Sequence, residues 1–292
     1  MTSVDVSVLT PSFGYARFIG DALRSVSLQA GVEVAHVVQD AGSEDGTVEL
    51  LREAGPGVDW RSEPDSGQSD ALNRAFARAQ GTWVSWLNAD EFYLPGALRH
   101  LVDEAERHNA DIVYGDSVFV DRDGRLERLL SQHRFDRTTL FHYGTIIPSC
   151  AVLMRREAFR DSRWDGSLRL LMDRDIYLQL VQQGAKAVYT KRPIGAFRVH
   201  DERVSAGTSA SFATDYARIA EKYGPTSKAM KRLATARHRA LKLLDGSYGK
   251  QRRVATLKGR NLRWFDSQEG TENCVELMRV YGVGARIATA AS

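Results

Sequence analysis

The sequence predicts an α/β fold in which a mostly parallel sheet is flanked by helices. Short apolar segments alternate with segments whose apolar residues recur at helical spacing, the order produced when crossover helices join parallel strands. Polar clusters follow several of the apolar segments directly. After residue 207 the pattern changes to long basic segments that favour helix. We therefore expect two parts, residues 1–207 and a helical, basic C-terminal extension at 208–292.

The elements can be justified in chain order. Residues 4–9 alternate and then become apolar, which predicts a strand, and Ile19, Leu23 and Val26 give residues 16–29 the spacing of a helix. Strands over 32–38 and 58–60 each lead through a glycine-containing turn into a helix, from residue 47 and over 69–79. The later expected elements are strands at 82–87, 112–114, 151–154 and 187–189, a hairpin beginning at 117–121, and helices at 95–107, 175–183, 211–223, 227–244 and 250–264.

Composition limits the class of protein. The chain has 292 residues, is 43% hydrophobic and 26% charged, and carries a formal net charge of only +3. No apolar run reaches the roughly 18 residues of a membrane-spanning helix. The first predicted strand begins almost at Met1, so we expect no signal peptide. The two cysteines, Cys150 and Cys274, support neither a zinc site nor a disulfide framework, and a reduced cytoplasmic location is the expectation.

Four polar clusters begin where predicted strands end. Because the carboxyl ends of parallel strands share one edge of a sheet, the clusters should converge on one crevice. Turn and cap chemistry explains each cluster singly, but it does not explain why all four fall on the same edge. The clusters are Thr10–Phe13, Asp40–Thr47, Glu63–Asp70 and Asn88–Glu91.

The last cluster, Asn88-Ala89-Asp90-Glu91, ends an almost wholly apolar strand. Carboxylates held at the end of a buried strand are candidate ligands for Mg²⁺ or Mn²⁺, which in turn hold phosphates. The alternative is a helix cap, with Pro95-Gly96 opening the next helix. From this segment alone the two interpretations are about equally supported.

The ordered set of motifs resembles the family-2 glycosyltransferases, which use nucleotide sugars and have a GT-A fold. The resemblance covers about residues 4–207. It implies a Rossmann-like GT-A domain that binds a nucleotide-diphosphate sugar and transfers the sugar, with inversion, to an acceptor hydroxyl. The motifs that carry it are Val6–Ser12, Val37–Thr47, Trp86–Glu91 and Leu171–Leu178.

The resemblance implies a nucleotide-sugar site along the predicted edge. Asp40 would accept the base N–H, as a carboxylate can for a uracil or thymine edge, so UDP or dTDP donors are favoured. A guanine base presents a different edge, which leaves the base open. Asp70 stands where the related pattern often has a small or basic residue. The residues implied in donor binding are Thr10, Pro11, Ser12, Asp40, Asp65, Asn73, Asn88, Ala89 and Asp90.

The resemblance also implies a metal site. Asp90 matches the last acid of the family's Asp-x-Asp motif, whereas Asn88 replaces the first acid, so we expect weaker Mn²⁺ or Mg²⁺ binding than with two carboxylates. Glu91 would support Asp90. His200 resembles the family's distal histidine and could supply another ligand, although a lone histidine after a strand is more often a surface or capping residue.

Asp173 matches the family's catalytic aspartate, the base that takes the acceptor proton. Asp175 is the less favoured alternative. Both are also ordinary acids for the start of a helix, where the dipole would lower the pKa of a carboxyl group. Trp164 and Asp165 could line the acceptor pocket, and residues 143–148 could form a mobile loop beside it.

Three functions compete at this stage. The leading one is a metal-dependent, inverting glycosyltransferase in polysaccharide, glycolipid or natural-product glycosylation. A sugar-phosphate nucleotidyltransferase would need a glycine-rich basic loop after the first strand, which Thr10–Gly14 lacks. A non-catalytic nucleotide-sugar-binding scaffold fits the Asn88 replacement, but the presence of Asp90, Asp173 and His200 argues against it.

The sequence of the basic C-terminal third does not show what this segment binds. Residues 227–244 combine cations with Met230, Leu233, Leu241 and Leu244 in an amphipathic, cationic helix. This helix could pack on the catalytic domain or on a second subunit, or it could lie on the anionic inner face of a membrane near a lipid-linked acceptor. Nucleic acid is not expected as a partner, because no recognised binding module accompanies the charge.

Overall fold

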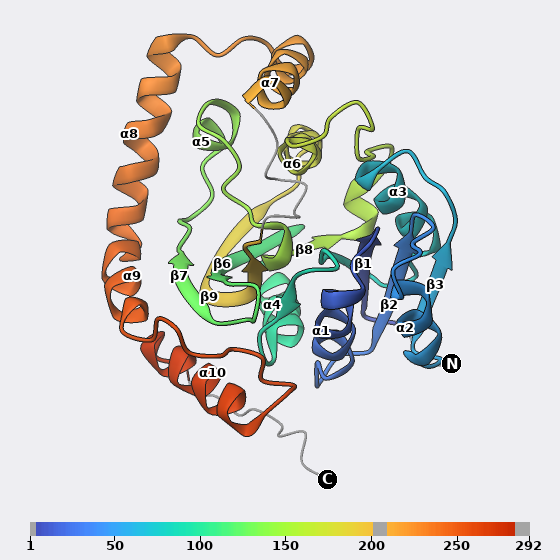
Figure 1. The fold of residues 1–292 in the computed structure, drawn as a ribbon. Helices are drawn as coiled ribbons and strands as arrows, with labels where there is room; N and C mark the ends of the chain where they lie inside the picture. The colour runs from blue at the N-terminus through green and yellow to red at the C-terminus, as the bar shows by residue number, and fades with distance from the viewer. Residues whose placement is uncertain (1–3, 201–208, 284–292) are drawn as a thin grey trace.

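The computed structural model describes residues 4–200 and 209–283. Within them, a nine-stranded sheet has the order β3-β2-β1-β4-β8-β6-β9-β5, with β7 paired to β6. Figure 1 shows helices on both faces of this sheet, and C-terminal helices that run along one flank of the molecule. This is the mixed α/β architecture that the alternating pattern predicts.

The first half of the chain builds a parallel sheet. The register places Ser12 beside Asp40, Asp40 beside Ser62, and Leu9 beside Trp86, so four strands end at one edge. Every residue of the first strand is buried, because helices cover both of its faces. The elements are β1 (Val6–Ser12), α1 (Ala16–Ser27), β2 (Val34–Asp40), α2 (Thr47–Glu53), β3 (Val58–Ser62), α3 (Gln68–Arg78) and β4 (Trp83–Trp86).

The second half extends the sheet with mixed strand directions. β8 runs antiparallel to both β4 and β6, whereas β9 lies parallel to β6 along almost its whole length. The elements are β5 (Phe92–Tyr93), α4 (Ala97–His108), β6 (Ile112–Val120), β7 (Leu126–Leu130), α5 (Arg137–His142), η1 (Ser149–Ala151), β8 (Val152–Arg155), η2 (Arg156–Phe159), α6 (Met172–Gln182) and β9 (Ala187–Arg198).

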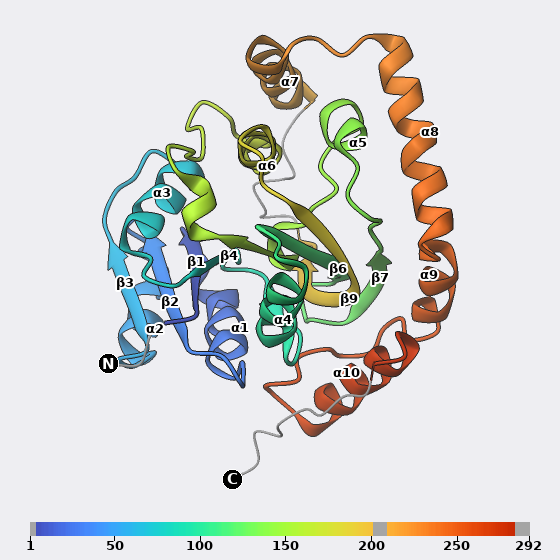
Figure 2. The ribbon, with the colours of Figure 1, turned by 180° about the vertical axis from the view of Figure 1, so that it is seen from behind.

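The C-terminal extension packs onto the sheet domain. Its helices are α7 (Ser209–Tyr223), α8 (Lys228–Leu244), α9 (Ser247–Ala255) and α10 (Gln268–Val280). Trp264, Cys274 and Leu277 share a buried apolar cluster with Phe92 and Val118 of the sheet. Figure 2 shows α8, α9 and α10 following one another around the outside of β7 and β9. The expected boundary at 207/208 lies outside the described residues.

A buried polar node strengthens this junction. The Asp116 carboxylate on β6 accepts hydrogen bonds from Lys250 of α9 (2.9 Å), Tyr281 (2.8 Å) and Tyr189 of β9 (2.6 Å). Asp116 has no exposed surface and the Lys250 side chain is 8% exposed, so removal of either partner would leave an uncompensated buried charge. The node therefore fixes the last helices against the sheet.

Several sequence-based boundaries were wrong, each for a local reason. The last core strand does not stop at 189 but continues to Arg198, because Pro193 and Gly195 are accommodated where β6 has register shifts. The helix expected at 250–264 ends at Ala255, since the following backbone hydrogen-bonds with Leu126 at the start of β7. The short elements β5 and α5 and the helix α10 were not predicted. In the described part of the chain, no helix is long and apolar enough to cross a bilayer.

Candidate active site

The polar clusters converge as the topology requires. They lie at the ends of β1 to β4, which are adjacent and parallel, so the four loops leave the sheet at one edge. The first strand was expected to end at residue 9 but continues to Ser12, so Thr10–Ser12 are its last residues, as Asp40 is the last residue of β2. A direct contact joins two of the loops, because the Gln68 amide donates to the Asn88 side-chain oxygen at 2.7 Å. The Asn88 oxygen also accepts from the Trp86 indole at 2.8 Å. Asn88 is therefore held in place at the edge.

The residues that end β1 are buried in the edge itself. Thr10 lies 2.9 Å from His36 of β2 through their side chains, and burial lowers the pKa of His36 to about 3, which keeps the imidazole neutral. Pro11 is buried, and the Ser12 hydroxyl is buried without a hydrogen-bond partner among the described residues. Phe13 follows with 65% of its surface exposed. The end of β1 is therefore closed to solvent, and the exposed Phe13 ring lies directly after it.

Asp40 organises the turn after β2. Its carboxylate accepts from the backbone N–H groups of Gly42 (3.1 Å) and Ser43 (2.8 Å) and from the hydroxyls of Ser43 (2.6 Å) and Ser62 (2.7 Å). The side chain has no exposed surface. In this conformation the carboxylate shapes the loop that follows β2, and contact with a base requires some of these donors to be exchanged.

Asp65 and Asn73 have different surroundings. The Asp65 carboxylate accepts the Gly67 N–H at 2.8 Å, and partial burial raises the pKa of Asp65. The Asn73 amide forms a pair of hydrogen bonds with the backbone of Trp164, at 2.8 and 3.0 Å. Asn73 therefore positions the segment before α6, and its amide is engaged there.

Asp90 and His200 meet at the edge although 110 positions separate them. The Nε2 atom of His200 lies 2.9 Å from Oδ2 of Asp90, and the His200 side chain is fully buried. The imidazole packs between Phe18, with ring centroids 4.7 Å apart, and Tyr15, at 6.2 Å. The start of α1 therefore packs against the histidine and helps to hold it beside the Asp90 carboxylate.

This pair suits a divalent cation that is shared with a phosphate. The Asp90 carboxylate can only accept a hydrogen bond, so Nε2 of His200 carries the proton in this contact, and Nε2 would become a metal ligand only when a cation displaces that proton; the other ring nitrogen, Nδ1, is buried and has no hydrogen-bond partner among the described residues. The described residues contain no group of three or more His, Cys, Asp and Glu arranged around one point. A cation at Asp90 and His200 would therefore depend on a bound diphosphate for its remaining ligands.

Glu91 lies behind this pair. Its carboxylate accepts from the Asn88 backbone N–H (2.9 Å) and the Ser149 hydroxyl (3.3 Å). Burial, together with the neighbouring charge of Asp90, raises the pKa of Glu91. Ala89 is also buried, with 1% of its surface exposed. Glu91 thus ties the loop of residues 88–91 to η1.

Arg198 fixes the backbone of the same loop. Its guanidinium donates to the Asp90 carbonyl at 2.9 Å and to the Asp21 carboxylate at 2.6 Å, and it lies over the rings of Phe18 and Phe92. Asp21 also accepts from Arg263 of the C-terminal extension at 2.8 Å. The position of Asp90 therefore depends on α1, on β9 and on the extension.

Asp173 stands at the first turn of α6. Its carboxylate accepts from the Arg174 N–H at 2.6 Å and from the Thr145 hydroxyl at 3.4 Å. Burial raises the pKa of Asp173 to about 6 and outweighs these hydrogen bonds. The expectation that the helix start would lower this pKa was wrong, because desolvation is the larger effect.

Short contacts connect Asp173 to the Asp90 side of the edge. Residues 145–149 reach from one to the other, since Thr145 contacts Asp173 and Ser149 contacts Glu91. On a second path, the Ser69 hydroxyl of α3 lies 3.3 Å from the Met172 sulfur, one residue before Asp173. Asp90 and Asp173 are thus linked by two short chains of contacts, the second of which continues from α3 through Gln68 to Asn88.

The three weaker acceptor-side residues are engaged in the fold. Asp175 is fully buried, and its carboxylate is held by Lys222 (2.8 Å) and by the Tyr223 hydroxyl (2.6 Å) of α7. Trp164 is 2% exposed and packs edge-on against Trp86. Asp165 is partly exposed and lies 3.6 Å from Lys222. Of the three, Asp165 retains the most access to solvent.

Sequence reasoning missed Gln68, Thr145, Ser149, Arg198 and Asp21. Gln68 lies within the polar cluster Glu63–Asp70 and Arg198 lies two residues before His200, but an isolated glutamine or arginine resembles a surface residue until its partner is known. Thr145 and Ser149 lie in a segment without periodicity, and Asp21 lies on an ordinary amphipathic helix. Each of these roles depends on a contact between distant parts of the chain.

Solved structures share this architecture. The chain aligns with a Staphylococcus aureus TarS structure, residues 1–349 in complex with UDP-GlcNAc, at a TM-score of 0.64 and 14% identity, covering 96% of this chain and 92% of that one. It aligns with the mannosyltransferase PcManGT of Pyrobaculum calidifontis, in complex with GDP-Man and Mn²⁺, at a TM-score of 0.61 and 16% identity, covering 99% and 78%. The fold is therefore of the GT-A type.

Sequence comparison assigns the family. Residues 7–163 match the sequence profile "Glycosyl transferase family 2", which is more than half of the chain, and the protein belongs to that family. A PGL/p-HBAD biosynthesis glycosyltransferase of Mycobacterium bovis is 28% identical over 179 residues, 56% of this chain and 68% of the relative. Uncharacterized glycosyltransferases of a Nostoc species (27% identical) and of Rickettsia typhi (22%) match over 40% and 68% of this chain, which spans 40% and 65% of their lengths.

Proposed function

We propose that this protein is an inverting, metal-dependent glycosyltransferase that moves a sugar from a nucleotide-diphosphate donor to an acceptor hydroxyl. The observation that carries the proposal is the 2.9 Å approach of Asp90 and His200 at a sheet edge that short contacts join to Asp173. Family membership supports the same reaction class.

The donor would lie across the ends of β1, β2 and β4. The turn organised by Asp40 forms the base end, with the exposed ring of Phe13 beside it, and Asp90 and His200 form the diphosphate end. A bound Mn²⁺ or Mg²⁺ there would neutralise charge on the departing nucleotide. The carboxylate of Asp40, which can accept the N–H of uracil or thymine, favours UDP or dTDP donors; the structural neighbours were solved with UDP-GlcNAc and with GDP-Man, and they support a nucleotide-sugar donor of either base.

Asp173 would act on the acceptor. The acceptor oxygen forms a bond to the anomeric carbon as the bond from that carbon to the diphosphate oxygen breaks, and Asp173 takes the hydroxyl proton. A carboxyl group with a pKa near 6 is ionised at neutral pH and is a stronger base than an exposed aspartate. Attack opposite to the leaving group inverts the configuration at the anomeric carbon.

The remaining parts of the proposal concern location and contacts. We propose that the acceptor is a sugar, a lipid-linked molecule or a small molecule, and that the enzyme works in the cytoplasm at the inner face of the membrane. Both cysteines are buried free thiols, which is compatible with a reducing compartment. The C-terminal helices would provide the contact with a membrane or with a second copy.

A nucleotide screen by thermal unfolding tests the donor site. UDP, dTDP and GDP sugars are each compared with and without Mn²⁺, and a ligand at ten times its Kd stabilises the native state by about 1.4 kcal/mol. We expect a Mn²⁺-dependent rise of a few degrees for one base class, lost in Asp90→Ala and kept in the control Asp103→Ala, which changes an exposed acid on α4. Equal responses of the two variants would contradict the proposed site.

Transfer itself is tested separately. The wild-type protein with the stabilising donor and Mn²⁺ should release nucleotide, and NMR of the product should show the anomeric configuration opposite to that of the donor. A pocket that binds the donor but never releases nucleotide would instead support the scaffold function. Formation of a nucleotide sugar from a nucleoside triphosphate and a sugar phosphate would support the nucleotidyltransferase.

A further inference from the structure

Helix α8 presents a cationic and apolar face that no other described part of the chain covers. The helix runs along the outer flank of the molecule in both views (Figures 1 and 2). It contains six Lys and Arg residues and no Asp or Glu. Its inner face packs on the domain through the buried Ala234 and through Arg237, which pairs with Asp136 at the start of α5. The orientation of the helix is therefore fixed.

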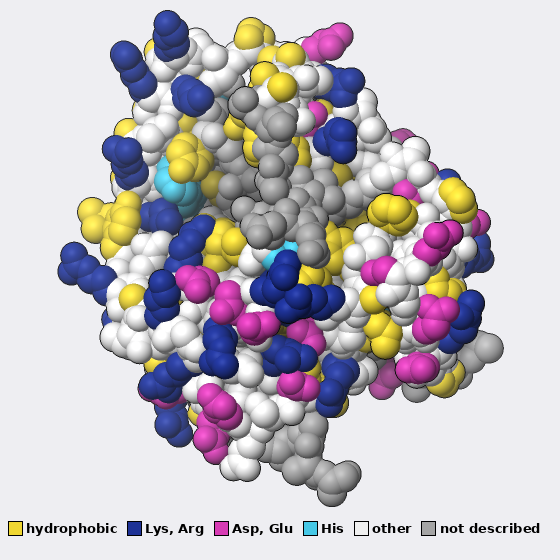
Figure 3. Space-filling view, viewed as in Figure 1, with side chains coloured by type: hydrophobic (Ala, Val, Ile, Leu, Met, Phe, Trp, Pro, Cys, Tyr) yellow, Lys and Arg dark blue, Asp and Glu magenta, His cyan; other side chains and the backbone are white. Residues whose placement is uncertain are grey.

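The outward face is apolar along its centre. Leu233, Leu243 and Leu244 are 50%, 69% and 70% exposed, and Ala236 and Ala240 continue the same stripe. Leaving such leucines in water costs free energy in proportion to their apolar area. In the space-filling view, hydrophobic side chains lie between Lys and Arg side chains along this flank (Figure 3). The stripe is therefore a candidate contact surface.

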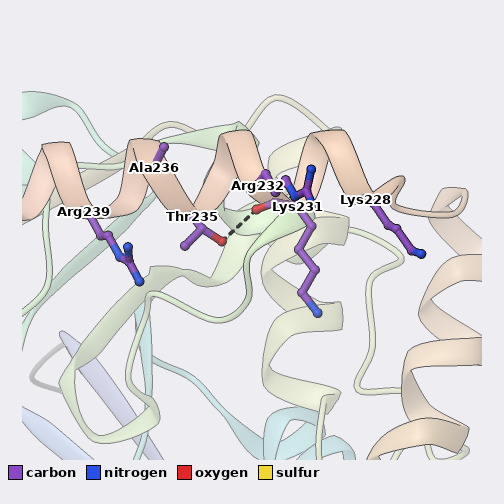
Figure 4. A pocket seen from close by; sticks show the side chains of 6 residues that line it. All are labelled: Lys228, Lys231, Arg232, Thr235, Ala236 and Arg239. Atoms are coloured by element: carbon purple, nitrogen blue, oxygen red, sulfur yellow. Dashed lines mark hydrogen bonds between the residues drawn. The ribbon is translucent and has the colours of Figure 1, made fainter.

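Cations line one side of the stripe: Arg232 and Arg239 lie four residues before Ala236 and Leu243, and Lys228 and Lys231 lie further around the helix. Among the ion pairs of the described residues, none includes Lys228, Lys231, Arg232 or Arg239. Figure 4 shows Lys231 and Arg239 extending from the same side of the helix as Thr235, whose hydroxyl donates to the Lys231 carbonyl at 2.7 Å. A depression of about 430 Å³ is lined by these side chains, namely Lys228, Lys231, Arg232, Thr235, Ala236 and Arg239. Its charge suits a phosphate group.

We propose that α8 docks the protein on an anionic lipid surface, with the leucine stripe in the interface and the four cations on lipid phosphates. A helix with an apolar stripe and a strongly basic rim is suited to lie in a membrane plane. A second copy fits less well, because α8 against α8 would bring together two sets of these four cations, which are unpaired within the described part of the chain. Nucleic acid binding would use the cations but not the leucines.

The position of α8 would place the candidate acceptor side near that surface. On its inner face, His238 stacks on Tyr143, with ring centroids 4.1 Å apart. Tyr143 precedes Thr145 by two residues, and Thr145 contacts Asp173. The docking surface does not depend on the transfer reaction, so it can be tested without the donor or the acceptor.

Vesicle binding by the full chain tests the proposal. Vesicles of phosphatidylcholine with about 30% phosphatidylglycerol are compared with phosphatidylcholine alone by co-sedimentation at about 0.05 M and about 0.5 M NaCl. We expect at least roughly tenfold stronger binding to the anionic vesicles at low salt, falling at high salt. Equal binding to both vesicle types, or no binding to either, would overturn the proposal.

Two variants separate charge from apolar contact. Each cation near an anionic surface contributes about fivefold to binding, so neutralising four should lower it by roughly 20-fold or more after screening. The apolar variant, with three exposed leucines changed, should lose roughly tenfold while keeping the charge. The charge variant is Lys228→Gln, Lys231→Gln, Arg232→Gln and Arg239→Gln, and the apolar variant is Leu233→Gln, Leu243→Gln and Leu244→Gln.

A matched control removes four exposed cations from other faces of the molecule. It should bind anionic vesicles within about twofold of the wild type, because its cations lie away from α8. Equal losses in the control and the charge variant would show a general charge effect and would overturn the assignment. Lipid-free dimerisation abolished by the leucine changes would assign the face to a second copy instead. The control changes are Arg52→Gln, Arg107→Gln, Arg160→Gln and Lys186→Gln.

Discussion

Replacing Asp173 by asparagine should raise stability while it removes transfer. Burial raises the pKa of Asp173 from 3.8 to about 6, and at about 1.4 kcal/mol per pKa unit this corresponds to at most about 3 kcal/mol of unfavourable ionisation. Because the side chain keeps partial contact with solvent, we expect a gain of about 1–2 kcal/mol for Asp173→Asn. The asparagine oxygen can still accept the Arg174 N–H.

The gain in stability from Asp173→Asn should depend on pH. A carboxyl group whose pKa is raised by folding binds its proton more tightly in the native state, so the wild type loses stability as pH rises from about 4 to about 6. Asparagine does not titrate. The difference in the free energy of unfolding between variant and wild type should therefore be near zero below pH 4 and complete above pH 6. Urea unfolding at several pH values measures it.

The same substitution, Asp173→Asn, should lower the rate of sugar transfer although it raises stability. Loss of the proposed base should lower the transfer rate by about 10²- to 10⁴-fold with unchanged donor binding, and wild-type kcat/KM should rise with pH through about 6. Asp175→Asn is the contrasting control, because its carboxylate is paired with Lys222 and its removal should destabilise the protein. A wild-type transfer rate in Asp173→Asn, or a loss of stability at pH 8, would refute the reasoning.

Three further outcomes follow from the contacts. His200→Ala should raise the Mn²⁺ concentration needed for donor-dependent stabilisation by roughly tenfold or more, and a titration followed by thermal unfolding would measure it. Lys250→Met should lower the free energy of unfolding by about 3 kcal/mol, because the Asp116 charge stays buried; co-substitution with Asp116→Asn should recover part of this in urea unfolding. Gly195→Ala should abolish or strongly weaken folding, since a Cβ there would lie 2.1 Å from the Cys150 carbonyl oxygen, and soluble yield with circular dichroism would report it.

The sequence predicted the parts of the fold that have strong periodicity. The alternation of strands and helices through Trp86 predicts four parallel strands and the edge at which their loops meet, and β1 to β4 have this arrangement. β9 was harder to predict, because Pro193 and Gly195 interrupt the pattern and only pairing with β6 shows that the strand continues. Helix α10 was missed for a related reason, since its apolar residues become meaningful only against Phe92 and Val118.

The residues of the candidate site could also be predicted from the sequence only in part. Acids and a histidine after apolar strands could be singled out because their chemistry is visible in the sequence. The burial that raises the pKa of Asp173 was not visible, and the helix-start argument gave the wrong direction. The supporting contacts, such as Arg198 with the Asp90 carbonyl and Thr145 with Asp173, join positions far apart in the chain, and periodicity carries no information about them.

The shared carboxylate of Asp21 has a practical consequence for protein engineering. One of its oxygens accepts from Arg198, which secures the loop of Asp90, and the other accepts from Arg263 in the C-terminal segment. Truncating the chain to a minimal catalytic unit, or exchanging this segment with that of a relative, would remove one of two cations that balance Asp21. Chimeras should therefore be designed with α1, β9 and residue 263 inherited together from one parent.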